Sequence, residues 1–118
     1  MPLPLDTRAV HHVTLEVSDL DRSIHFLERV LGLHTVPRKD FPGALAWTAA
    51  ADAVQIHLAP VAELPRKSGI NPHVALAVAS LPATRAALAD AGIAFDEFGP
   101  VLFVPDPDGN VFELREGD

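Results

Sequence analysis

Three histidines and one glutamate stand at spacings that suit a metal site. His12 and His73 each begin a strand-like segment, and His57 and Glu113 follow them at similar separations, 57 − 12 = 45 and 113 − 73 = 40. Imidazole nitrogen and carboxylate oxygen are common protein ligands of divalent ions. Four such groups converging on one cleft would bind one ion.

The spacing reflects an internal repeat. At an offset of 73 − 12 = 61 residues, the segment 12–17 matches the segment 73–78, and apolar positions further along match too. Both segments alternate at period two, as half-buried strands do. In each copy the histidine lies on the face opposite the aliphatic residues. The same parity predicts that His57 and Glu113 point away from the helix of their own copy.

Each copy predicts one strand, one helix and three further strands, which makes two βαβββ modules in an α+β fold. Ser18 and Ser80 are the expected helix N-caps, and Gly32 and Gly92 the expected ends of the helices. The first module covers about residues 10–60 and the second about 72–116, joined by a polar linker at 61–71, all within one domain, 1–118. The expected strands are 11–17, 33–38, 44–48 and 54–58, then 73–78, 93–97, 101–104 and 110–115.

A module of this kind is a curled sheet covered by a helix on one face. Its other face must be covered by another sheet, so two modules should enclose a cleft with both helices outside. The four candidate ligands are expected to face that cleft.

Composition narrows the function classes. The formal charge of 9 − 16 = −7 argues against nucleic acid or an anionic membrane as partner. No cysteine is present, which excludes thiolate ligands and disulfides. Neither a transmembrane run nor a signal peptide is recognisable, so a cytoplasmic location is expected.

For each aromatic residue and each histidine taken alone, a structural role is the alternative to a functional one. A lone cleft-facing histidine is more often a hydrogen-bonded structural residue, and it is the joint placement in a repeat that favours metal binding. The remaining histidines, His11, His25 and His34, are interpreted as structural or surface residues. Trp47 and Phe103 either wall an apolar substrate pocket or pack in the core.

The sequence resembles the vicinal oxygen chelate superfamily, which includes glyoxalase I, bleomycin-resistance proteins and extradiol dioxygenases. The likeness is carried by residues 12–20 (HVTLEVSDL) with Phe26 and 30–33 (VLGL), by 73–76 (HVAL), and by 106–114 (DPDGNVFEL). It implies paired βαβββ modules around a metal ion.

The resemblance also implies roles for single residues. His12, His73 and Glu113 match the usual His, His and Glu ligands, and His57 matches the fourth ligand of glyoxalase I, often a glutamate that acts as base. Thr14 matches a substrate-side threonine near the metal in fosfomycin-modifying members. Glu16 stands where glyoxalase I usually has an arginine that contacts glutathione.

The leading hypothesis is a glyoxalase-like lyase or isomerase for a small oxygenated substrate, working through a metal-stabilised enolate or alkoxide. Glu113 or His57 would move the proton, and the divalent ion could be Zn, Ni, Co, Fe or Mn. One alternative is an Fe(II) dioxygenase that uses His12, His73 and Glu113 as its triad. Another is a non-catalytic protein that binds a drug or metabolite, as bleomycin-resistance proteins do.

The expected assembly is a homodimer with composite sites. The linker permits each module to pair with the other module of its chain or with one from a second chain, and small members of the resembled family often choose the second. In the predicted dimer His12 and Glu113 come from one chain, and His73 or His57 from either.

Overall fold

The computed structural model describes residues 6, 8–39, 41–50, 53–64 and 73–116. Its first half contains β1 (His12–Val17), α1 (Leu20–His25), the π-helical turn η1 (Phe26–Val30), β2 (His34–Pro37), β3 (Leu45–Thr48) and β4 (Gln55–Pro60). Its second half contains β5 (His73–Val78), α2 (Leu81–Asp90), β6 (Asp96–Phe98), β7 (Val101–Pro105) and β8 (Val111–Glu116). Most of the expected linker, residues 65–71, lies outside the described residues.

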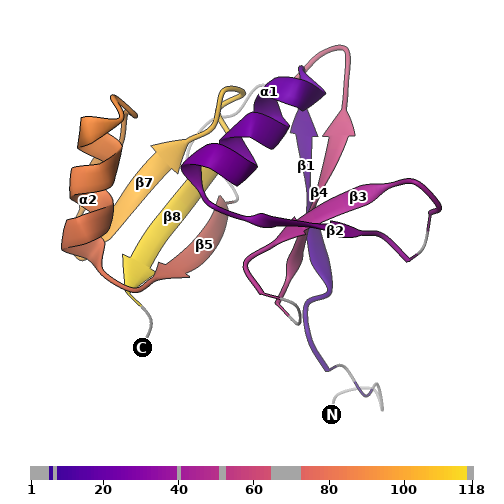
Figure 1. Ribbon diagram of the computed structural model, residues 1–118, viewed down its shortest axis with the longest axis horizontal. Helices are drawn as coiled ribbons and strands as arrows, with labels where there is room; N and C mark the ends of the chain where they lie inside the picture. Colours follow the sequence, from indigo (N-terminus) through magenta and orange to yellow (C-terminus); the bar gives the residue numbers. More distant parts are fainter. Residues whose placement is uncertain (1–5, 7, 40, 51–52, 65–72, 117–118) are drawn as a thin grey trace, which may run out of the picture.

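The two halves have the same topology, which confirms the prediction of two βαβββ modules. Each forms a four-stranded mixed sheet, ordered β1-β4-β3-β2 in the first module and β5-β8-β7-β6 in the second. The first and last strands of each module are parallel neighbours, and the other neighbours are antiparallel. The sheets lie side by side and remain separate (Figure 1).

The strands β1 and β5 alternate as the sequence pattern predicts. Val13, Leu15 and Val17 are partly or fully buried, whereas the side chains between them are exposed. In β5 the same alternation leaves His73 exposed and buries part of each intervening aliphatic side chain. The histidine face of each sheet is therefore the face that no helix of its own module covers.

The ends of the helices agree with prediction at three points and differ at one. Ser80 caps α2 by accepting a hydrogen bond from Ala83 N at 3.2 Å, and Gly32 and Gly92 have φ of 66° and 70°. The N-cap of α1 is Asp19, whose Oδ1 accepts from Arg22 N at 3.1 Å, rather than the expected Ser18. The hydroxyl of Ser18 instead bonds a residue of the second module, as described below.

One cluster of buried side chains joins the modules. Phe26 of η1 contacts Phe112 of β8, with ring centroids 5.9 Å apart. Figure 1 shows α2 at the outer end of the molecule and α1 between the two sheets. The expectation that both helices lie outside therefore holds for α2, while α1 packs at the junction.

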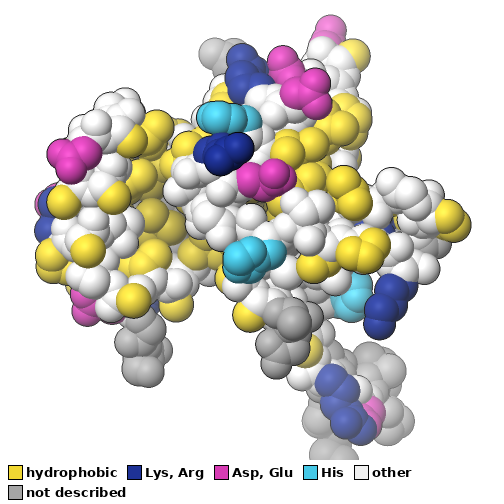
Figure 2. All heavy atoms as spheres, viewed as in Figure 1, with side chains coloured by type: hydrophobic (Ala, Val, Ile, Leu, Met, Phe, Trp, Pro, Cys, Tyr) yellow, Lys and Arg dark blue, Asp and Glu magenta, His cyan; other side chains and the backbone are white. Residues whose placement is uncertain are grey.

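Basic side chains are scattered on the visible face of the molecule (Figure 2). On the face shown in Figure 2, Lys and Arg side chains are dispersed among hydrophobic and acidic ones. No helix within the described residues is long and apolar enough to cross a membrane.

Candidate metal centre

The first module brings His12 and His57 together. The parallel ladder between β1 and β4 pairs His12 with Gln55 and Thr14 with His57, so all four side chains leave the sheet on one face. The imidazole rings of His12 and His57 stack with centroids 3.9 Å apart and planes within 14°. His12 is exposed, and His57 is 3% exposed.

Gln55 orients the ring of His57. The distance from His57 Nε2 to Gln55 Oε1 is 3.1 Å. An amide oxygen only accepts hydrogen bonds, so Nε2 carries a proton in this contact. This contact restrains the rotation of the buried imidazole.

The second module brings His73 and Glu113 together. The ladder between β5 and β8 pairs His73 with Val111 and Ala75 with Glu113, which again places both donors on one face. His73 Nε2 lies 3.2 Å from Glu113 Oε1, and the two side chains are 33% and 13% exposed. The other oxygen of Glu113, Oε2, is 3.5 Å from Arg115 Nη1.

The four candidate ligands therefore form two pairs at equivalent places of the repeat. Each pair joins the first strand of a module to its last, His12 with His57 and His73 with Glu113. No group of three or more His, Asp or Glu side chains that could hold a metal occurs within the described part of the single chain. We call these two pairs the half-sites of the candidate metal centre.

The residues expected to contact substrate fall on different faces. Thr14 shares the face of His57, and Phe103 lies directly opposite Glu113 with its ring 5.9 Å from that of His73. Trp47 pairs with Ile56 on the helix-covered face and is 3% exposed.

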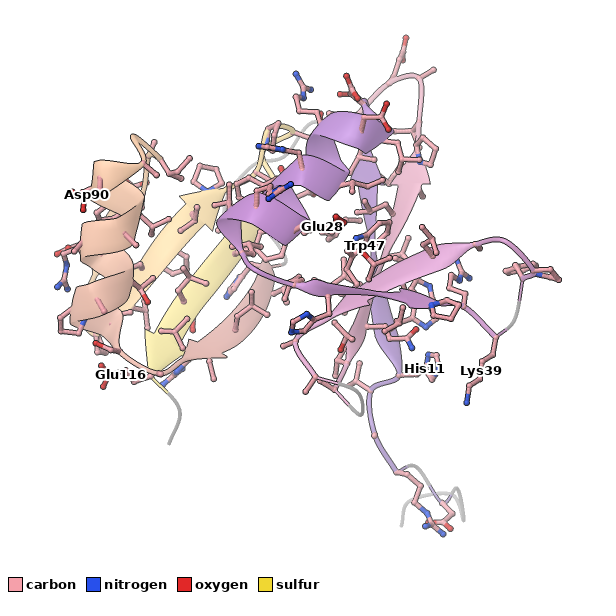
Figure 3. The ribbon with its side chains drawn as sticks, viewed as in Figure 1. His11, Glu28, Lys39, Trp47, Asp90 and Glu116 are labelled. Carbon is pink, nitrogen blue, oxygen red and sulfur yellow. The ribbon has the colours of Figure 1, made fainter. Side chains whose placement is uncertain are left out.

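The contacts of Trp47 match the core-packing alternative. Its Nε1 donates a hydrogen bond to Glu28 Oε2 at 3.4 Å, and Figure 3 shows its side chain directed toward Glu28. We therefore do not count Trp47 among the residues of the cleft.

Three further residues of the half-sites were not predicted to take part. Gln55 and Arg115 stand two positions from His57 and Glu113, and this same-face spacing is the signal that could have found them. His11 precedes the first residue of β1, so strand parity does not determine where its side chain lies. Its Nδ1 is 2.9 Å from His12 Nδ1.

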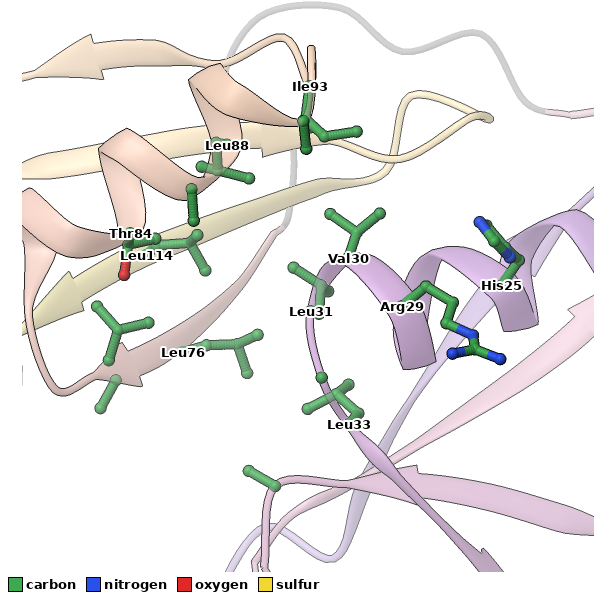
Figure 4. Close-up of a pocket in the computed structure, with 16 residues that line it drawn as sticks. His25, Arg29, Val30, Leu31, Leu33, Leu76, Thr84, Leu88, Ile93 and Leu114 are labelled. Atoms are coloured by element: carbon green, nitrogen blue, oxygen red, sulfur yellow. The ribbon is translucent and has the colours of Figure 1, made fainter.

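A cavity at the junction of the modules is separate from the half-sites. It has a volume of about 650 Å³ and lies between η1 and the helix-covered face of the second sheet (Figure 4). Its walls are mostly aliphatic, including Leu31, Leu76 and Leu114, and none of the four candidate ligands lines it. The cavity therefore belongs to the junction of the modules.

Asp108 ties the two modules together at this junction. Its carboxylate, 3% exposed, accepts hydrogen bonds from Ser18 Oγ at 2.5 Å and Ser18 N at 3.1 Å. Burial alone raises the pKa of this carboxyl group. The bonds from Ser18, the charge of Arg22 at 3.5 Å and the hydroxyl of Ser23 outweigh burial and hold the pKa of Asp108 below its ordinary value.

Residues 9–114 match the family model of the Glyoxalase/Bleomycin resistance protein/Dioxygenase superfamily. The chain belongs to this superfamily. A relative, "Glyoxylase I 4" from Arabidopsis thaliana, is 32% identical over an alignment of 132 residues. The alignment covers 98% of this chain and 74% of that protein.

Solved structures show the same superfamily fold. A glyoxalase/dioxygenase from Nostoc punctiforme superposes with a TM-score of 0.76 at 22% identity, covering 100% of this chain and 97% of that one. TnmS3, an antibiotic binding protein from Streptomyces sp. CB03234, gives 0.72 at 20% identity, covering 97% and 99%. The superfamily fold thus accommodates proteins described as enzymes and as binding proteins.

Proposed function

We propose that this protein is a divalent-metal-dependent, glyoxalase-like lyase or isomerase that acts on a small oxygenated substrate. The observation that carries the proposal is the pairing of donors at equivalent places in both modules. His12 stacks on His57 at 3.9 Å, and His73 lies 3.2 Å from Glu113. Two local pairs, each on the sheet face that the helix of its own module leaves uncovered, are what a metal site assembled from two modules requires.

The donor set fits a divalent ion. His12, His57, His73 and Glu113 would hold it, and three imidazoles with one carboxylate suit Zn, Ni, Co, Fe or Mn. When bound, the ion supplies Lewis-acid polarisation of the substrate's oxygens and stabilises negative charge that develops there. The second ring nitrogen of each histidine then needs a hydrogen-bond partner that fixes its tautomer.

A second copy of the chain completes the site. The histidine faces of both sheets are exposed at β1 and β5 in the single chain. In the proposed homodimer, the first module of one copy faces the second module of the other. Each of the two equivalent sites then contains His12 and His57 from one copy and His73 and Glu113 from its partner. This division replaces the expected one, in which His12 and Glu113 came from the same chain, because Glu113 pairs with His73 within its own module.

Proton transfer belongs to Glu113 or His57. One of these groups removes a proton from a substrate carbon next to a carbonyl and returns it to the neighbouring carbon, so the substrate is isomerised without an oxidant. Thr14, which shares a sheet face with His57, would donate a hydrogen bond from its hydroxyl to a substrate oxygen. Phe103 provides an apolar wall beside His73, and closure of the dimer excludes water.

The 32% identical Arabidopsis relative, which is called a glyoxylase, supports the choice of reaction class. The substrate's thiol group is left open, because acidic Glu16 shares the exposed face of β1 with His12. A carboxylate there repels the carboxylates of a thiol such as glutathione, so adducts of neutral or basic thiols are the better candidates.

The test is metal analysis of freshly purified protein, followed by assays with α-keto aldehyde adducts of several thiols and with catechols under air. We expect about one ion per chain and isomerisation of a thiol adduct. Oxygen consumption with a catechol would instead support the dioxygenase alternative. Tight binding of an antibiotic by metal-free protein without turnover would support the binding-protein alternative.

A further inference from the structure

The imidazoles of His11 and His12 contact each other through the Nδ1 atom of each ring. Their Nδ1 atoms are 2.9 Å apart, and the rings stand nearly perpendicular, at 85°, with centroids 5.1 Å apart. At this distance one nitrogen must carry the proton and donate it while the other accepts. The contact therefore couples the tautomers of the two histidines.

The direction of this hydrogen bond follows from the proposed role of His12 as a metal ligand. A neutral imidazole that binds a metal through Nε2 has its proton on Nδ1. We propose that His11 is a positioning residue that accepts this proton and so holds His12 in the ligand tautomer. The inference rests on the proposed function, because it assumes that His12 is a metal ligand.

The backbone holds His11 in place for this role. Gln55 N donates a hydrogen bond to the carbonyl oxygen of His11 at 3.1 Å, which extends the β1–β4 contact by one residue beyond β1. Figure 3 shows His11 at the start of β1. The acceptor is thus anchored to the strand that carries His57.

Two contacts then restrain the ring of His12. His57 stacks on one face at 3.9 Å, and His11 approaches the edge that carries Nδ1. Within the described part of the chain, His11 is the sole hydrogen-bond partner of the His12 imidazole. Loss of His11 should therefore free both the rotation and the tautomer of His12, while the stack remains.

The experiment compares His11→Ala and His11→Asn in the full-length protein. The side-chain oxygen of asparagine can occupy the place of Nδ1 and accept the same proton, whereas alanine cannot. His34→Ala is the matched control, because His34 is also an exposed histidine of the first sheet but lies on β2. The readouts are the Kd for Zn²⁺, by competition with a chromophoric chelator, and the His12 tautomer in metal-free protein, by two-bond ¹H–¹⁵N NMR at one fixed pH.

We expect His11→Ala to raise the Kd for Zn²⁺ about 10- to 100-fold, the usual effect of losing the partner of a ligating histidine. His11→Asn should bind close to wild type, and His34→Ala should not differ from it. In NMR, wild type and His11→Asn should show His12 with its proton on Nδ1, and His11→Ala should show a mixture.

Equal Zn²⁺ affinity of His11→Ala and wild type would overturn the inference alone, as would a wild-type His12 protonated on Nε2. Wild-type protein that takes up no metal would overturn the proposed function and this inference with it.

Discussion

His57 and Glu113, the donors on the last strand of each module, each have a hydrogen-bonding neighbour two residues away on the same strand. Gln55 contacts His57 at 3.1 Å on β4, and Arg115 contacts Glu113 at 3.5 Å on β8. Because side chains two apart share a face of the sheet, these neighbours orient the donors within a module. The orientation of these two donors is therefore set by contacts within their own module.

Replacing His73 with Ala tests its role as a ligand. Removal of one of four donors should weaken metal binding by more than about 100-fold, since even a change in the surroundings of a ligand costs 10- to 100-fold. Activity should fall in parallel with metal content, measured by elemental analysis after gel filtration. His34→Ala, which changes an exposed histidine outside the half-sites, should keep both. Full metal content in His73→Ala would contradict the assignment.

Replacing His57 with Ala separates a ligand from a proton-transfer group. As a ligand, His57 is needed for metal content; as the base, it is needed only for turnover. Its hydrogen bond to Gln55 leaves its ring oriented in either case. We expect a loss of kcat of at least about 100-fold, the usual contribution of general acid–base catalysis. Unchanged kcat with unchanged metal would exclude both roles.

The alternation of side chains along a strand allowed the half-site residues to be predicted from the sequence. It did not predict the placement of His11 and Trp47. Inside a strand the face of a side chain follows from its position, so His12, His57, His73 and Glu113 could be assigned to one kind of face. His11 lies just outside β1, where the rule does not apply. Trp47 lies on the helix-covered face of β3, and the pairing that places it there, with Ile56, depends on a register that sequence does not give.

At the scale of secondary structure, the turn between β7 and β8 connects the modules. Asp106 Oδ1 accepts from Asn110 N at 2.7 Å and Asp108 N at 2.9 Å, and Gly109 has φ of 82°. This rigid turn presents Asp108 to the start of α1 and lets Asn110 Nδ2 donate to Glu16 O at 3.1 Å. The turn therefore sets how the second module sits against the first.

The N-cap residue of α1 could not be predicted from the local sequence. Ser18 and Asp19 are both good N-cap residues, and the sequence alone does not choose between them. Ser18 is 90 positions from Asp108 in the chain, yet its hydroxyl bonds that carboxylate. Asp19 is then left to cap the helix. By contrast, the N-cap of α2 and the glycine that ends it were predictable, because among the described residues Ser80 bonds within the start of its own helix.

Asp108→Asn should destabilise the protein by about 1–3 kcal/mol at pH 7, because it removes a buried charged acceptor from Ser18 and Arg22. The pKa of Asp108 is lowered by folding, so its contribution is fully present above the unfolded value of about 4 and is lost as the pH falls through the folded value. The difference in unfolding free energy between wild type and variant should therefore shrink below about pH 4.

Urea unfolding at a fixed protein concentration and several pH values measures this difference. Asp96→Asn, at an exposed position of β6, is the matched control and should stay within about 0.5 kcal/mol of wild type. A difference for Asp108→Asn that is the same at pH 7 and pH 3 would contradict the role assigned to the charged form.

At the scale of the whole molecule, the proposed homodimer would bring the two half-sites together. The side chains of His12, Thr14 and Glu16 are exposed on β1, and those of His73, Ala75 and Ala77 on β5. In the proposed dimer each histidine face would form half of a cleft. We expect sedimentation velocity at micromolar concentration to give a dimer, and a monomer whose sedimentation does not depend on concentration would contradict the proposed assembly.

The central claim is that each metal site takes one half-site from each of two chains. Inactive His12→Ala and His73→Ala proteins can be mixed in equal amounts, unfolded and refolded together, and their metal content measured. In the mixed dimer one site carries both changes, and the other is intact. Random pairing makes about half of the dimers mixed, with one intact site of two, so about a quarter of the wild-type metal should return.

The control mixes His73→Ala with Glu113→Ala, which both lie in the second half-site. Every site of every dimer then lacks a donor, and no metal should return. Recovery of about a quarter of the wild-type metal in the first mixture, with none in the control, is the result predicted by composite sites. No recovery in the first mixture, despite a wild-type protein that regains its metal after the same refolding, would contradict them.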